Sequence, residues 1–233
     1  MDNQMFCFQC QEASKGVGCT IKGVCGKEAS TAMYLDLLKF VAKGISIVTT
    51  AFRHQGEAVS KEANHWVTTA LFTAITNANF DDEAIKERIG AGIVLRNKLI
   101  QEAQSKGIEL PQVEAITWAG AEETYAEQAK KVGVLSEAHE DLRSLKELVI
   151  NGLMGMAAYL DHAERLGFED EACHAFTQEA LNDITVKSLG ADELTALVMK
   201  TGEFGVHAMA LLDKANTTKY GHPEMTKVNI GVG

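Results

Sequence analysis

Apolar residues recur every three or four positions over most of the chain, which is the period of a helix buried on one face. The clearest stripe has successive spacings of 3, 4, 4, 3 and 4 residues and runs through Leu142, Leu145, Val149, Leu153, Met156 and Leu160. An earlier stripe of the same kind runs through Tyr34, Leu38, Val41, Ile45 and Val48. Both stripes predict long helices that pack against a shared core, and Gly167 marks the expected end of the later one.

The rest of the pattern also predicts helices joined by short links. Expected helices cover residues 57–78, 82–105, 121–131, 169–187 and 191–214, with a connector at 107–120. Asp81 can cap the helix that starts at residue 82, and Gly107 lies just beyond its expected end. The chain has only 2 prolines and is rich in strong helix formers. The prediction is therefore an all-α protein built of antiparallel helical bundles.

The two ends of the chain break the helical pattern. Residues 1–28 are rich in Cys, Gly and Gln and read as an irregular loop. Near the other end, Val228, Ile230 and Val232 alternate with polar or small residues, which predicts a strand at 226–232. The expected organisation is a cluster-binding loop at 1–28, a helical bundle domain at 29–222, and the start of an α/β domain missing from this chain at 223–233.

Charge and hydropathy narrow the classes of function. Acidic residues outnumber basic ones by 32 to 22, and the net charge of -10 argues against nucleic-acid binding. The sequence has no apolar run of about 18 residues, so we expect no membrane span. The N-terminus lacks the basic and apolar regions of a signal peptide, and we expect a cytoplasmic protein in which thiols stay reduced.

Four of the five cysteines form the most informative motif. Cys7, Cys10, Cys19 and Cys25 lie within nineteen residues, with the spacing C-x2-C-x8-C-x5-C. Four thiolates are the usual ligands of an iron–sulfur cluster. A structural zinc site remains the rival interpretation, although such sites usually have two short C-x2–4-C pairs, and four unrelated free thiols is the third. Spacing alone does not fix the type of cluster.

The residues around these cysteines suit an anionic cluster. Glycines let the loop curl closely, and Lys15, Lys22 and Lys27 flank the cysteines with positive charge. Cys173 stands alone on an expected helix, and its simplest interpretation is a small buried thiol. The seven histidines are scattered, so we expect them to be structural or exposed.

Two sets of motifs resemble one known family. The first is MFCFQCQE at 5–12 with GCT at 18–20 and GVCGK at 23–27. The second is TGEFGV at 201–206, MALLDKANT at 209–217, and the segment from Tyr220-Gly221 to the VNIGVG at 228–233. Together they resemble the first domain of the hybrid cluster proteins, also called prismane proteins or hydroxylamine reductases, and they bracket the whole chain.

This resemblance implies a helical domain with one conventional cluster held by Cys7, Cys10, Cys19 and Cys25. Relatives with this compact spacing carry [4Fe-4S], and relatives with a wider spacing carry [2Fe-2S]. The family's hybrid Fe–S–O cluster, where hydroxylamine is reduced to ammonia, is held by later α/β domains. We therefore do not expect that cluster in this chain, and we expect no catalytic residue in it. The resemblance also implies a ferredoxin- or flavoprotein-type electron donor and contact with those α/β domains.

Three functions follow as hypotheses. The chain is the electron-transfer domain of a hydroxylamine-reductase-like protein, inactive by itself. Alternatively, it is a complete electron-transfer module that passes electrons to a partner. The third alternative is a stand-alone helical binding module that holds an iron–sulfur cluster or a four-cysteine zinc site.

Overall fold

The computed structural model describes residues 5–228 and residue 231. Within this part of the chain the structure is helical and no strand is formed, so the all-α prediction is confirmed. The α-helices in the described residues are α1 (Ala29–His54), α2 (Lys61–Ala74), α3 (Asp82–Ser105), α4 (Glu114–Thr117), α5 (Tyr125–Val132), α6 (Glu140–Arg165), α7 (Glu171–Val186) and α8 (Ala191–Tyr220).

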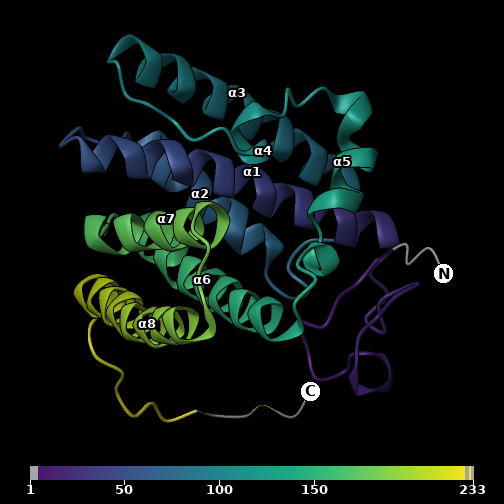
Figure 1. The fold of residues 1–233 in the computed structure, drawn as a ribbon. Helices are drawn as coiled ribbons and strands as arrows, with labels where there is room; N and C mark the ends of the chain where they lie inside the picture. The colour runs from purple at the N-terminus through teal and green to yellow at the C-terminus, as the bar shows by residue number, and fades with distance from the viewer. Residues whose placement is uncertain (1–4, 229–230, 232–233) are drawn as a thin grey trace.

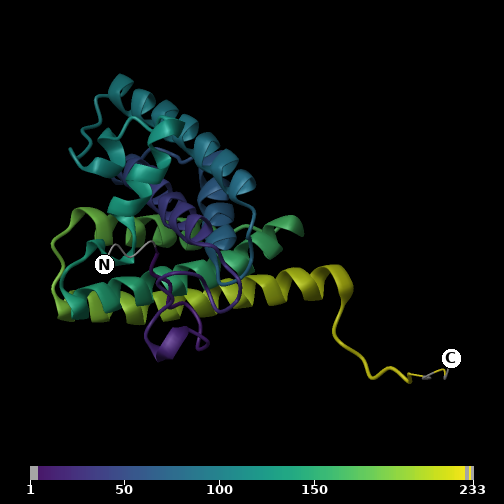
Figure 2. The same cartoon turned by 90° about the vertical axis from the view of Figure 1, so that its right-hand side faces the viewer.

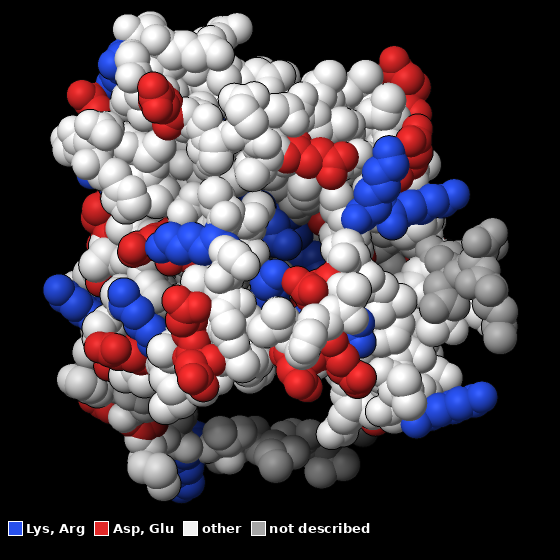
Figure 3. Space-filling view, in the orientation of Figure 1, with Lys and Arg blue, Asp and Glu red and all other residues white. Residues whose placement is uncertain are grey.

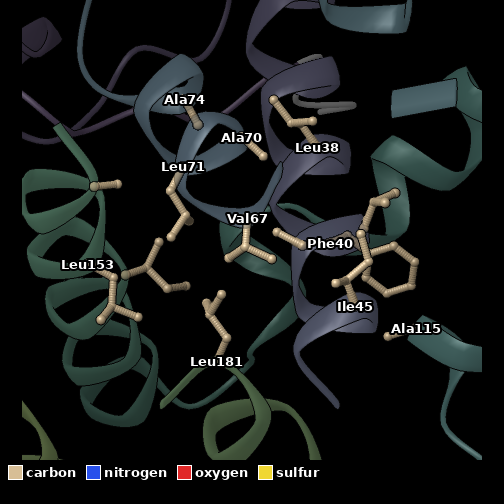
Figure 4. Close-up of a cluster of buried hydrophobic side chains, with 14 of the residues drawn as sticks. Leu38, Phe40, Ile45, Val67, Ala70, Leu71, Ala74, Ala115, Leu153 and Leu181 are labelled. Atoms are coloured by element: carbon tan, nitrogen blue, oxygen red, sulfur yellow. The ribbon is translucent and has the colours of Figure 1, made fainter. Parts of the chain in front are cut away.

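Helix α1 lies at the centre of the molecule. Helices α3, α4 and α5 pack on one side of it, and α2 and α7 pack on the other (Figure 1). Helix α6 packs against α2, and α8 forms the outer layer on α6. The buried side chains of α1, α2, α6 and α7 meet in one core, where Leu38, Leu71, Leu153 and Leu181 are all fully buried (Figure 4).

The outermost helix is held by a narrow seam. Its buried residues recur at every seventh position, at Leu194, Thr201, Ala208 and Ala215. This is the repeat of a helix pair packed side by side. The α6 backbone approaches closely at this seam, because a Cβ atom added to Gly152 would lie 2.6 Å from Thr201 Cγ2. One face of α8 is therefore buried on α6, and much of the remaining surface is open.

Capping residues and glycines in the sequence predicted several helix boundaries correctly. The Asp81 carboxylate accepts hydrogen bonds from the backbone N–H groups of Glu83 and Ala84 at the start of α3. Gly107 and Gly167 have φ angles of +69° and +85° just after α3 and α6, a conformation that glycine adopts most easily. The expected ends of these two helices are thus confirmed.

Four expectations need correction. The helix expected at 57–78 is shorter and begins after Ser60, whose side chain accepts a hydrogen bond from the Ala63 N–H. The connector at 107–120 contains the short helix α4, and the last helix continues to Tyr220. Residues 226–228 form no strand, and no described segment is placed to pair with them. The rest of the expected strand includes 229–230 and 232, which lie outside the described residues.

Two surface features bear on the expected function. No helix in the described part of the chain combines the length and the apolar character needed to cross a membrane. On the face seen in Figure 3, acidic and basic side chains are interspersed and form no continuous basic surface. The absence of nucleic-acid binding stays a prediction.

Candidate metal centre

The four cysteines lie on one irregular loop, residues 5–28, at the end of the bundle where α1 begins (Figure 2). Two of them face each other across a short antiparallel bridge. The Cys7 N–H donates to the Cys19 carbonyl at 3.0 Å, and the Cys19 N–H donates to the Cys7 carbonyl at 2.8 Å. In such a pair the Cα atoms are about 5.5 Å apart and both side chains project to the same face. The backbone therefore presents the Cys7 and Cys19 sulfurs on one side of the loop.

The other two cysteines lie in adjoining turns. The Cys10 carbonyl accepts a hydrogen bond from the Ala13 N–H at 3.1 Å. Cys25 lies in a turn closed by the Gly26 N–H to Gly23 carbonyl bond at 2.8 Å. Cys19 is buried, Cys7 and Cys10 are half-buried, Cys25 is exposed, and all four are free thiols. The loop thus offers four unpaired sulfurs at different depths.

The sulfurs do not yet converge. Among the described residues, no three His, Cys, Asp or Glu side chains are arranged to hold a metal ion. The structure brings the four cysteines onto one loop and pairs Cys7 with Cys19 across a backbone bridge. The donor set itself, four thiols and no disulfide, fits an iron–sulfur cluster and also fits zinc.

Glycine is required where the loop folds on itself. A Cβ atom at Gly18 would lie 2.7 Å from a ring carbon of Phe6, closer than real Cβ contacts allow. Gly26, next to Cys25, has a φ angle of +92°. The Phe6 and Phe8 rings lie 5.5 Å apart on either side of Cys7. The glycines are therefore part of what brings aromatic cover and cysteines into one small volume.

The loop is attached to the helices at defined points. The Thr76 hydroxyl donates to the Gln9 side-chain oxygen at 3.1 Å, which joins the loop to the segment after α2. Lys22 forms an ion pair with Glu28, the residue just before α1. Cys19 packs with Met5 and Ala32 in a small buried cluster of its own. The cysteine loop is thus anchored on α1 and separate from the main core.

The start of α1 suits a negative neighbour. No side chain caps it, and its first turn has no acidic residue. Every other α-helix in the described residues has an acidic residue in the first turn. A helix N-terminus carries partial positive charge that favours nearby anions. Cys7 and Cys19 pack beside Ala29 and Ala32 at this end of α1.

The lysines flanking the cysteines differ in position. Lys27 is only 2% exposed, and its Nζ lies 5.9 Å from the centre of the Phe80 ring. Lys15 and Lys22 are exposed at the tip of the loop. Only Lys27 therefore holds its charge inside the protein, where solvent screens it weakly.

The fifth cysteine takes no part in this site. Cys173 is fully buried on α7, and burial raises the pKa of its thiol to about 12, with a further contribution from Asp170. It remains protonated and unreactive, so its expected role as a small buried thiol is confirmed.

Two sets of interacting charged residues were not predicted from the sequence. Glu164 on α6 lies between two histidines, with Oε2 2.7 Å from His65 Nδ1 and Oε1 3.2 Å from His174 Nε2. Asp36 and Lys39 on α1 form an ion pair at 2.8 Å close to the cysteine loop. The Glu164 cluster forms only where α2, α6 and α7 meet, so no local sequence pattern predicts it. The second was visible as two charges inside the apolar run of α1.

The fold and the loop together define an all-α domain with a four-cysteine candidate metal centre at one end. The family model for the prismane/CO dehydrogenase family matches residues 5–233. This chain belongs to that family, whose members contain iron–sulfur clusters.

Curated relatives named hydroxylamine reductase agree with this assignment. The protein from Porphyromonas gingivalis is 53% identical over 234 residues, which is 100% of this chain and 42% of the relative. The proteins from Clostridium perfringens and Nitratidesulfovibrio vulgaris are 50% and 48% identical, each over 98% of this chain and 42% of the relative. The chain therefore spans about two fifths of the length of these relatives.

Proposed function

We propose that this helical domain binds one [4Fe-4S] cluster through Cys7, Cys10, Cys19 and Cys25 and passes electrons in a hydroxylamine-reductase-type protein. The observation that carries the proposal is the cysteine loop itself, with four free thiols, two of them paired across a backbone bridge, packed on the uncapped start of α1. The cluster supplies one-electron redox chemistry when bound. The protein provides its ligands and its charge environment.

Electron entry is proposed at the tip of the cysteine loop. Val17, Ile21 and Val24 are 71%, 79% and 62% exposed, an unusual amount of open apolar surface for one short loop. Lys15 and Lys22 border these side chains, and there is no acidic residue between positions 13 and 27. This surface suits an acidic electron-transfer protein of the ferredoxin or flavoprotein type. Contact with the α/β domains of a longer protein is the alternative use of the same surface.

The reaction of the whole relatives is proposed to need more than this domain. Hydroxylamine reduction to ammonia consumes two electrons and requires a substrate site. Outside the cysteine loop, the described residues contain no group of His, Cys, Asp or Glu side chains arranged to hold a metal. We propose that the domain relays electrons and that reduction takes place at a hybrid cluster held elsewhere. A reducing compartment, the cytoplasm, is the proposed location, since exposed thiols persist there.

A zinc site is the second candidate, because four thiols also suit tetrahedral zinc. Metal analysis of anaerobically prepared protein separates the two. We expect about four iron and about four sulfide per chain, as in a cubane with four cysteine ligands, and an S = 1/2 EPR signal after reduction with dithionite. One zinc per chain without sulfide would contradict the proposal. Turnover of hydroxylamine by the isolated chain at the rate of a full-length relative would contradict the assignment as a relay.

A further inference from the structure

A small cavity lies between the cysteine loop and the helices, on the inner side of Cys7. Its volume is about 10 Å³, enough for about one water molecule. Four charged side chains share its lining with Cys7, namely Lys27 from the loop, Asp36 and Lys39 from α1, and Glu147 from α6. Of the four proposed ligands, only Cys7 lines this cavity beside buried charged side chains.

Lys39 is the most firmly held of these charges. Its side chain is 6% exposed, and its Nζ lies 2.8 Å from Asp36 Oδ1. Burial by itself lowers the pKa of Lys39, but the charges of Asp36 and Glu147 and that of a Cys7 thiolate outweigh burial and hold it above its ordinary value. Lys39 is thus a buried cation, paired with Asp36, that lines the same cavity as Cys7.

We propose that Lys39 is a positioning residue for charge, which raises the midpoint potential of the cluster bound at Cys7, and that Asp36 limits this effect by pairing with it. The inference rests on the proposed cluster. Reduction adds one negative charge to the cluster, so a fixed cation beside a ligand stabilises the reduced state. Because the pair is buried, salt screens this interaction only weakly.

The sign of each substitution follows from this arrangement. Lys39→Met removes the cation and leaves the Asp36 carboxylate, so the potential should fall. Asp36→Asn removes the anion and keeps the ammonium, so the potential should rise. The double variant removes both charges and should fall between the two single variants. A disturbed fold or a loosened loop would not produce shifts of opposite sign.

The test is an EPR-monitored redox titration of the loaded wild-type and variant chains at low and high salt. For Lys39→Met we expect the reduced-to-oxidised ratio at a fixed potential to fall about tenfold, equal to about 59 mV for a one-electron couple. Lys43→Met is the matched control, because Lys43 is also on α1 but does not line this cavity. Its shift should be less than a third as large. High salt should leave the Lys39→Met shift largely intact.

Each outcome decides the matter. If the wild-type chain contains no iron and sulfide, the proposed function and this inference fail together. If the cluster is present and the Asp36→Asn and Lys39→Met chains keep the wild-type potential, the inference alone fails. Equal shifts in the Lys39→Met and double variants would assign the effect to packing and overturn the role of charge. If Lys39→Met does not fold, a raised potential in Asp36→Asn supports the inference, and an unchanged one overturns it.

Discussion

Replacing Glu164 with Gln tests whether the joint between α2, α6 and α7 is held by charge. The Glu164 side chain is 10% exposed and that of His174 is 4% exposed, whereas the His65 side chain is 61% exposed. Glu164 Oε2 forms a short hydrogen bond with His65, while Oε1 lies near His174 without the alignment of a strict hydrogen bond. The substitution keeps the size of the side chain and removes its charge.

The expected loss of stability is moderate. Hydrogen bonds to charged groups contribute about 1.5–3 kcal/mol each, and an exposed partner such as His65 contributes at the low end or below. Since the His174 contact is buried but imperfectly aligned, we expect Glu164→Gln to lower the free energy of unfolding by about 2 kcal/mol. Glu169→Gln is the matched control, because its carboxylate pairs with the 83% exposed Lys61 side chain and should cost under about 0.5 kcal/mol.

The pH dependence carries the sharper test. Burial by itself raises the pKa of Glu164, but the close contacts with His174 and His65 outweigh burial and hold this pKa below its ordinary value. A lowered acid pKa stabilises the fold fully above the unfolded pKa of about 4.3, and the effect is lost as the pH falls through the folded pKa. The difference between wild type and Glu164→Gln should therefore be fully present at about pH 5–6 and shrink below about pH 4. Urea unfolding of both proteins, followed by circular dichroism at several pH values, measures this difference in unfolding free energy. A difference that grows on acidification would refute the reasoning.

Four further substitutions test the site and the core. Cys19→Ser should abolish or severely reduce the iron content, whereas Cys173→Ser should leave it unchanged, as measured by metal analysis; equal loss in both would contradict the ligand assignment. Gly18→Ala should lower iron retention without changing helix content, because its Cβ would lie 2.7 Å from the Phe6 ring; full retention would show that the ring moves freely. Leu153→Ala should cost about 2–5 kcal/mol of unfolding free energy, as for other fully buried leucines, and a loss under about 1 kcal/mol in urea unfolding would place Leu153 outside the core.

The helices that the sequence predicted well are those with local signals. Helix α3 begins at the Asp81 cap and α6 ends before Gly167, and each signal acts within one turn of backbone. Helix α4 has no such signal. It is held by Arg96 of α3, whose guanidinium donates to the Ala115 carbonyl at 3.1 Å and to the Trp118 carbonyl at 2.7 Å. A short helix stabilised by a buried side chain from another element cannot be found from its own residues.

The features of the candidate site likewise include some with a local sequence signal and some that depend on the folded chain. Cysteine spacing predicted the proposed ligand set, because four thiols gathered on one short loop are a common pattern of iron–sulfur sites. It did not predict the order of burial, since that depends on how the loop packs on Ala32 of α1. Asp36 and Lys39 did carry a signal, because charges inside an apolar helical stripe are costly unless they are paired. Their meaning depended on the position of Cys7, which only the folded chain supplies.

The packing of the cysteine loop indicates how the proposed cluster binding would be coupled to folding. Its buried residues, Met5 and Cys19, form a small cluster with Ala32 that is separate from the main core. The main core is complete without them, because α1, α2, α6 and α7 bury their apolar faces on one another. Metal–ligand bonds therefore add their free energy mainly to the loop. It follows that loss of the cluster should loosen residues 5–28 while the helices remain folded, so that iron content and helix content report on separate parts of the molecule.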